Sequence, residues 1–269
     1  MVLGLVLTGI CAGFISAFFG VGGGVVIVPA LYHFFPKLGH QMVIASSLAI
    51  IFVNCFLNLY NFRKLKRTPN FKAILFIGTH TLVGAIGASF LIELLDRKAI
   101  KAIFTAFLVY VIAKLIFQKT NTQSSDESNW RLELDSRTKL YSTIVGLSSG
   151  LISGLTGLGG GAILVPMFLT LFGMPMRWVP IYSNGCMIFA TGSGVVIHLL
   201  KGSALSSDLP QWLKVSTIGN VSFAIVGLVF VGALISSKLG VKVNDRVEPK
   251  VKKWLYGLLL TLVGVKIWL

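Results

Sequence analysis

The chain has 269 residues, of which 55% are hydrophobic and only 12% are charged, and its mean hydropathy is +0.84. Soluble domains carry roughly 25% charged residues, so a chain this apolar has too few polar groups to cover a water-facing surface. The composition therefore excludes an ordinary soluble protein. The formal net charge of +15 must be interpreted as that of a membrane protein.

The apolar stretches are each about as long as a helix that crosses a bilayer, roughly 20 residues. No alternation over about ten residues, typical of a membrane β-barrel strand, recurs along the chain. The sequence therefore predicts an all-α integral membrane protein. In chain order the predicted spans are Val2–Phe35 (interrupted), Met42–Phe62, Phe71–Leu95, Ala99–Phe117, Leu140–Gly173 (interrupted), Val179–Leu200, Trp212–Ser236 and Trp254–Leu269.

The first span is interrupted by glycines, and the same interruption recurs in the second half of the chain. Gly13–Leu31 reads GFISAFFGVGGGVVIVPAL, and Gly150–Phe168 reads GLISGLTGLGGGAILVPMF. The glycine runs and the prolines after them match without a gap, which predicts an internal repeat. We expect two homologous transmembrane repeats, residues 1–117 and 140–269, joined by a polar linker, residues 118–139.

A glycine run inside a membrane helix breaks the hydrogen-bond ladder, and the freed backbone groups must line a cavity or lie buried in protein. A helix that starts after the run directs its free N–H groups and positive dipole end there, which suits an anion. We predict half-helices on both sides of each run and a meeting of the two segments. The alternative is that the glycines only allow close helix packing. The predicted substrate-binding glycines are Gly20, Gly22, Gly23, Gly24, Gly157, Gly159, Gly160 and Gly161.

Polar side chains in the second span of each half are further candidates, because polar groups inside a membrane are costly and often functional. The offset of the glycine segments places Ser46 on Ser183. Asn54 and Asn58 are one helical turn apart and share a face. The predicted substrate-binding residues of these spans are Ser46, Ser47, Asn54, Ser183 and Asn184.

The third spans extend the repeat after a small shift, which places Gly78 on Gly219 and Thr81 on Ser222. His80 lies beside Thr81 and is also a predicted substrate-binding residue. A histidine titrates near neutral pH, so a proton relay is one interpretation. The alternative is a structural histidine whose hydrogen bonds are satisfied by its neighbours.

Basic residues gather in two short segments, one after the second span and one before the last. If each interrupted segment enters the membrane and returns, both basic segments lie on one side and the second half is inverted; if it crosses once, the halves are parallel. The positive-inside rule favours the inverted arrangement, and no aromatic-basic recognition module supports a nucleic acid partner. The basic residues are Arg63, Lys64, Lys66, Arg67 and Lys72, then Lys238, Lys242, Arg246, Lys250, Lys252 and Lys253.

Catalytic and metal-binding patterns are absent from the sequence. It contains no HExxH pattern, no nucleophile–base pair and no cluster of metal-ligand residues, so we predict neither an enzyme, a metal site nor a cofactor. The three cysteines, Cys11, Cys55 and Cys186, show no CxxC spacing and are interpreted as small apolar residues.

The paired glycine segments resemble the hallmark of the sulfite exporter TauE/SafE family of membrane transporters. The stretch from His40 through Leu48 is also similar to the second span of that family. The resemblance implies a permease of the bacterial plasma membrane that carries a small, often sulfur-containing anion, such as sulfite or a sulfonate. The run Tyr182–Gly185 departs from the family pattern, which bears on the substrate rather than on the fold.

We therefore expect a secondary transporter that works by alternating access. Its expected partners are a small anionic substrate, the lipid bilayer and a coupling ion, either a proton or sodium, and the sequence is compatible with a homo-oligomer. Two alternatives remain open: an anion channel, and a membrane assembly or interaction subunit without transport of its own.

Overall fold

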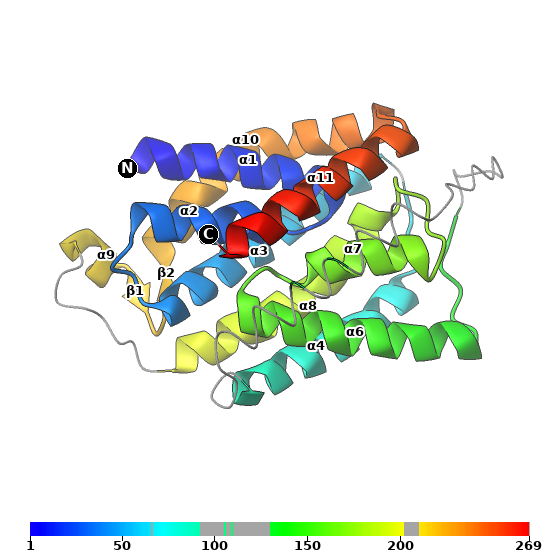
Figure 1. The fold of residues 1–269 in the computed structure, drawn as a ribbon, viewed down its shortest axis with the longest axis horizontal. Helices are drawn as coiled ribbons and strands as arrows, with labels where there is room; N and C mark the ends of the chain where they lie inside the picture. The colour runs from blue at the N-terminus through cyan, green and yellow to red at the C-terminus, as the bar shows by residue number, and fades with distance from the viewer. Residues whose placement is uncertain (66, 92–104, 106–108, 110–129, 202–209, 269) are drawn as a thin grey trace.

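The computed structural model describes residues 1–65, 67–91, 105, 109, 130–201 and 210–268. Figure 1 shows that most described helices lie roughly along the long axis of the molecule. The elements are α1 (Val2–Phe19), α2 (Gly24–Phe34), α3 (His40–Arg63), α4 (Phe71–Leu91), α6 (Ser136–Thr156), α7 (Gly161–Thr170), α8 (Val179–Leu200), α9 (Gln211–Val215), β1 (Thr217–Ile218), β2 (Val221–Ser222), α10 (Phe223–Arg246) and α11 (Pro249–Trp268).

Five helices of the described chain are long and apolar enough to cross a membrane: α1, α3, most of α4, α8 and α10. The described strands β1 and β2 form a minimal antiparallel hairpin, in which Thr217 pairs with Ser222 and Ile218 pairs with Val221. The predicted all-α membrane fold is therefore confirmed.

Both predicted interruptions are present, but the helices before them are longer than predicted. α1 has 18 residues and α6 has 21, whereas α2 has 11 and α7 has 10. At 1.5 Å per residue, the two short helices cover about half of a hydrocarbon core roughly 30 Å thick. The prediction of half-helices is right for the second pieces and wrong for the first. One reason is that α6 begins ahead of the predicted span, where the Asp135 side chain accepts a hydrogen bond from the Thr138 N–H.

The third span of the second half begins and ends later than predicted. Trp212–Ser236 was the expected span, but α10 begins only at Phe223, because the hairpin with Gly219 at a φ of +56° precedes it. Lys238 and Lys242 therefore lie within α10 and not in a loop, and Arg246 lies in its last turn. Cations at that end interact favourably with the helix dipole.

The third span of each half packs closely against the first helix of the other half. A Cβ added at Gly13 of α1 would lie 2.6 Å from the Ala233 Cα of α10, and one added at Gly150 of α6 would lie 2.0 Å from the Thr81 carbonyl oxygen of α4. Close packing explains these two glycines. Since Gly13 and Gly150 are equivalent in the repeat, Thr81 corresponds to Ala233, and its predicted match to Ser222 is wrong.

The predicted match of Gly78 to Gly219 is wrong for the same reason. Gly78 lies inside α4, whereas Gly219 and Asn220 form the turn of the hairpin that precedes α10. The shift between the repeats is therefore larger in the third span than the sequence suggested, because the second half carries the extra elements α9, β1 and β2 before α10.

α3 and α8 cross at the centre of the molecule in opposite directions. Leu48 lies against Gly194, while Asn58, further along α3, reaches back to Asn184 near the start of α8. Figure 1 shows α1, α3 and α10 running one way and α4, α6 and α8 running the other way. Each set takes two helices from one half of the chain and one helix from the other half.

Part of the predicted organisation lies outside the described residues, including most of the span Ala99–Phe117 and residues 118–129 of the predicted linker. The last residues of the predicted linker, Ser136–Lys139, belong to α6. Just before α6, the Leu132 N–H donates to the Tyr182 hydroxyl, which also accepts the Asn70 N–H. This contact fastens the end of the linker to the start of α4. The boundaries of the two repeats stay a prediction.

Candidate functional site

Each helix break is formed by glycines that adopt left-handed backbone conformations. Gly20 ends α1 at a φ of +83° and Gly23 precedes α2 at +80°; Gly157 and Gly160 repeat the arrangement at +71° and +77°. Residues with a Cβ rarely adopt this conformation, so the sequence needs glycine here. All eight predicted glycines are buried.

The two breaks pack directly against each other. A Cβ added at Gly24 would lie 2.8 Å from the Leu158 Cα, and one added at Gly161 would lie 2.6 Å from the Val21 Cα. The prediction that the two glycine segments meet is therefore confirmed. The first N–H groups of a helix have no partner within it. The residues at the capping positions of α2 and α7, Gly23 and Gly160, provide no side-chain hydrogen bond to these groups. Two positive helix ends thus start within the protein.

A serine from the opposite half holds the carbonyl group at each break. The Ser183 hydroxyl of α8 donates to the Gly20 carbonyl at 2.6 Å, and the Ser47 hydroxyl of α3 donates to the Gly157 carbonyl at 2.9 Å. Ser47, not Ser46, is therefore the counterpart of Ser183, and the predicted register was wrong by one residue. The Ser46 hydroxyl instead accepts the backbone N–H of Ser222 at 3.1 Å.

Asparagine and serine side chains form a buried hydrogen-bond network beside the break between α1 and α2. The Asn58 amide nitrogen donates to the Ser16 hydroxyl at 2.8 Å and to the side-chain oxygen Oδ1 of Asn184 at 3.0 Å. Ser237 donates to Asn58 at 2.7 Å, and Asn61 donates to Ser237 at 2.9 Å. All five side chains are at most 5% exposed. We call these residues, Ser16, Asn58, Asn61, Asn184 and Ser237, the polar cluster.

Asn54 lies on the same face of α3 as Asn58, one turn earlier, and one turn after Ile51. Ile51 borders the breaks, because its side chain lies within 3 Å of a Cβ added at Gly22 or Gly159. The Asn54 side chain is fully buried, and neither its amide nitrogen nor its carbonyl oxygen has a hydrogen-bond partner. A buried amide without partners is rare in folded proteins and needs an explanation.

His80 is not brought together with the other predicted residues. It lies where α4 faces α6, with its Nδ1 bonded to the Phe76 carbonyl oxygen at 2.7 Å and its Nε2 facing the Thr143 hydroxyl at 3.3 Å. These local bonds match the structural alternative for this histidine. The neighbouring Thr81 points toward α8 and donates to the Cys186 carbonyl oxygen at 3.0 Å.

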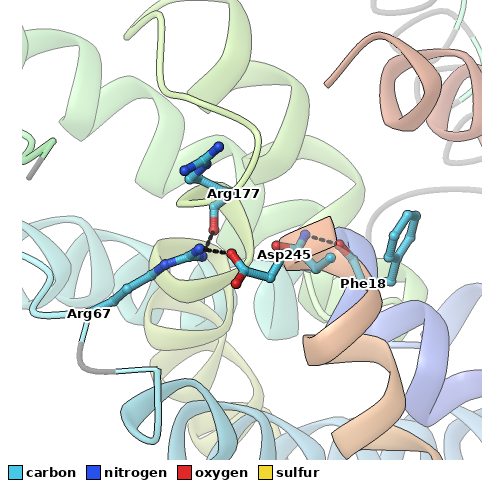
Figure 2. A network of polar contacts seen from close by, with 5 residues as sticks. Phe18, Arg67, Arg177 and Asp245 are labelled. Carbon is cyan, nitrogen blue, oxygen red and sulfur yellow. Dashed lines mark hydrogen bonds and ion pairs between the residues drawn. The ribbon is translucent and has the colours of Figure 1, made fainter. Parts of the chain in front are cut away.

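A charged network closes one end of the molecule, next to the end of α1. Figure 2 shows Arg67 pointing toward Asp245 and toward the backbone of Arg177. The Arg67 guanidinium forms an ion pair with Asp245, donates to the Arg177 carbonyl oxygen at 3.1 Å and lies over the Trp178 ring at 5.8 Å. Beside it, Asn244 donates to the Phe18 carbonyl oxygen at 2.6 Å. The network joins the segment after α3, the segment before α8 and the last turn of α10.

The substrate-binding residues predicted from the sequence include only Asn184 of the polar cluster. Asn58 could have been included, because its spacing of one turn from Asn54 was visible in the sequence. Ser16 was present in the repeat motif, but its hydroxyl could not be distinguished from one that bonds its own helix. Ser237 fell outside the predicted span, and no pattern in the sequence connects it with Asn61.

The chain is similar to known membrane proteins over nearly its whole length. The sequence profile of the family described as Sulfite exporter TauE/SafE matches residues 5–267. A probable membrane transporter protein of Haemophilus influenzae is 28% identical over 95% of this chain and 91% of its own length. One of Methanocaldococcus jannaschii is 27% identical over 97% of this chain and 93% of its own length. The probable membrane transporter protein YunE of Bacillus subtilis is 24% identical, with 98% and 96% covered. No solved structure is significantly similar to the chain.

Proposed function

Because the chain belongs to the sulfite exporter TauE/SafE family, and is thus a multi-pass membrane transporter, we propose that it moves a small anion by alternating access. The proposed substrates are sulfite, a sulfonate or a related small anion. The proposed location is a bacterial plasma membrane, as the relatives from Haemophilus influenzae and Bacillus subtilis suggest. No chemical conversion of the substrate is part of the proposal.

The meeting of two uncapped helix ends inside the protein is the observation that carries this proposal. The N-termini of α2 and α7 each present positive partial charge and free N–H groups, which favour a negative ligand. Among the described residues, the buried polar side chains include no carboxylate. A site of neutral donors and positive helix ends suits an anion better than a cation.

The directions of the helices support an inverted relation between the two repeats, which we propose as the basis of alternating access. α1 and α6 are equivalent in the repeat and run in opposite directions (Figure 1). The ion pair between Arg67 and Asp245 brings the two basic segments of the sequence to the same end of the molecule. Inverted repeats with broken helices are a recurring transporter design.

One-sided labelling tests the inverted arrangement. Single cysteines at Thr68 and Lys250 in a background without native cysteines are expected to react with an impermeant thiol reagent from the same side of the membrane. A cysteine at Lys37 is expected to react from the other side. Labelling of the Thr68 and Lys250 positions from opposite sides would contradict the arrangement.

Flux in proteoliposomes tests the transport proposal. Purified protein is reconstituted, and uptake of radiolabelled sulfite, methanesulfonate and acetate is measured with and without imposed proton and sodium gradients. We expect saturable uptake of at least one anion, and stimulation by one gradient would identify the coupling ion. Uptake that is not saturable would favour the anion channel.

The role of the glycine breaks in transport is tested by substitution. Gly23→Leu and Gly160→Leu place a side chain on the positive-φ caps of the two short helices. If the variants are expressed and monodisperse but lose anion flux, the breaks belong to the transport machinery. If the wild-type protein transports none of the anions tested while remaining folded, the transport proposal fails.

A further inference from the structure

We infer that the substrate anion binds in only one half of the pseudo-symmetric centre, at the N-terminus of α2, where Asn54 donates to it directly and the polar cluster holds Asn54's surroundings in place. The inference rests on the proposed anion transport and makes it specific. It assigns no equivalent site to the N-terminus of α7.

The internal symmetry of the site can be read from its contacts. Ser47 and Ser183 perform the same task for the Gly157 and Gly20 carbonyls. With this register, Ile51 corresponds to Met187, and both side chains lie beside a Cβ added at Gly22. The backbone frames around the two breaks are therefore matched, and differences between the halves must come from their side chains.

The side chains differ sharply at the positions that follow. In the same register, Asn58 corresponds to Gly194, and Asn184 corresponds to Leu48. Asn58 and Asn184 share a hydrogen bond of 3.0 Å, whereas at the equivalent place the Leu48 side chain fills the space next to Gly194. A polar pair on one side is thus replaced by an apolar contact on the other.

The rest of the polar cluster shows the same asymmetry. Since Ala233 corresponds to Thr81, Ser237 one turn later corresponds to Ala85. The residues Asn54 and Asn61 correspond to Ala190 and Ile197 in the register of α3 and α8. Ser16 alone keeps a hydroxyl in its counterpart, Ser153, and that hydroxyl has no hydrogen-bond partner. Among the described residues, the network of buried amides is therefore present only beside the break between α1 and α2, whereas the other half offers the single hydroxyl of Ser153.

Asn54 identifies the point at which a ligand would bind. Its amide group is fully buried without a partner, on the face of α3 between Ile51 at the breaks and Asn58 in the polar cluster. An unsatisfied buried amide is costly unless a ligand bonds it in another state. Together with the uncapped start of α2, the Asn54 amide N–H group supplies neutral donors to an oxyanion, in surroundings without a carboxylate among the described buried residues.

Two variants at Asn54 and one matched pair of serines test the inference. Asn54→Asp keeps the size of the side chain but adds a negative charge, and is expected to lower sulfite uptake in proteoliposomes at least tenfold. Asn54→Ala removes the donor and is expected to have a similar effect. Ser16→Ala is expected to raise the KM for sulfite several-fold, whereas Ser153→Ala at the equivalent position is expected to stay within twofold of wild type.

Folding and ligand charge are controlled separately. Size-exclusion profiles and thermal unfolding in detergent must match wild type for a variant to be interpreted, and Asn54→Ser serves as a milder variant that keeps a donor. Stabilisation of wild type by sulfite in thermal unfolding, lost in Asn54→Asp, would confirm anion binding at this position. Stronger sodium binding in Asn54→Asp with sulfite uptake intact would show a cation site instead and overturn the inference.

The outcomes separate this inference from the function it rests on. If wild type shows no anion uptake, the transport proposal itself fails. If wild type transports sulfite but Asn54→Asp and Asn54→Ala do as well, or Ser153→Ala is as impaired as Ser16→Ala, the one-sided site is wrong while transport stands.

Discussion

At the residue scale, a single serine hydroxyl satisfies the backbone carbonyl at each helix break. Ser183 is fully buried and donates to the Gly20 carbonyl, which lies beyond the hydrogen-bond ladder of α1. Ser183→Ala leaves that buried carbonyl without the hydroxyl donor, and an unsatisfied buried polar group costs about 1–3 kcal/mol.

We expect Ser183→Ala to lower the thermal unfolding midpoint in detergent by several degrees. The matched control is Ser193→Ala, because the Ser193 hydroxyl bonds only the Ala190 carbonyl of its own helix. That control is expected to change the unfolding free energy by less than about 0.5 kcal/mol. Equal effects of the two substitutions would show that the bond across the break has no special weight.

The positive-φ glycines have a different reason for their identity. Gly23 has a φ of +80°, and a Cβ there would lie 2.8 Å from the Ala12 carbonyl oxygen. Gly23→Ala is expected to cost about 1–2 kcal/mol in backbone strain, and more from the contact with α1. Chemical unfolding in detergent measures the loss. Gly227→Ala on α10 is the control, since nothing lies within 4 Å of a Cβ at that position; a loss as large there would contradict the argument.

At the element scale, α6 depends on its cap to begin where it does. The Asp135 carboxylate accepts the Thr138 N–H at 2.9 Å, and the hydrogen bonds with Thr138 lower the pKa of Asp135 below its usual value. A carboxyl whose pKa is lowered in the folded state stabilises that state above its unfolded pKa of about 3.9, and the contribution is lost as the pH falls through the lower folded pKa.

Hydrogen exchange in the first turn of α6 measures this cap. Asp135→Ala is expected to speed amide exchange at Thr138 and Lys139 at neutral pH, because the start of the helix frays. Asp135→Asn keeps an acceptor and is expected to preserve the protection, without the dependence on acid pH. Unchanged exchange in Asp135→Ala would show that packing alone fixes the start of α6.

At the scale of the whole molecule, the Arg67 network connects the two halves, and we expect it to act as a latch that keeps them together at this end. Arg67 joins the first half to Asp245 and to the Arg177 backbone of the second half. Asp245 is 40% exposed, so the ion pair contributes modestly, and partly exposed pairs are worth about 0.2–1 kcal/mol. A change of that size shifts a two-state equilibrium by up to about fivefold.

We therefore expect Asp245→Asn to increase, by up to about fivefold, the rate at which a thiol reagent reaches a cysteine placed at Ser16 from the basic end of the molecule. The exposed Arg63 lies in the same basic segment, and Arg63→Gln is the control for a change in charge alone. If both variants raise access equally, the surface charge and not the latch controls this end.

The membrane class, the similarity between the two halves and the two helix interruptions could be predicted from the sequence alone. These features depend on local composition and on glycines whose backbone conformation few other residues adopt, so they are visible along the chain. The sequence marked Asn54, because an amide in an apolar span is conspicuous. The sequence also placed His80 in the site. In the structure, His80 instead makes local hydrogen bonds at the contact between α4 and α6.

How the two halves pack together could not be predicted from the sequence. Because the connection before α8 differs in length by one residue, Ser183 is equivalent to Ser47 and not to Ser46. The hairpin before α10 likewise shifts the correspondence between α4 and α10 away from the predicted one. The polar cluster gathers side chains from α1, α3, α8 and α10 that are far apart in the sequence. Hydrogen bonds over such separations depend on how the helices cross, and no local pattern carries that information.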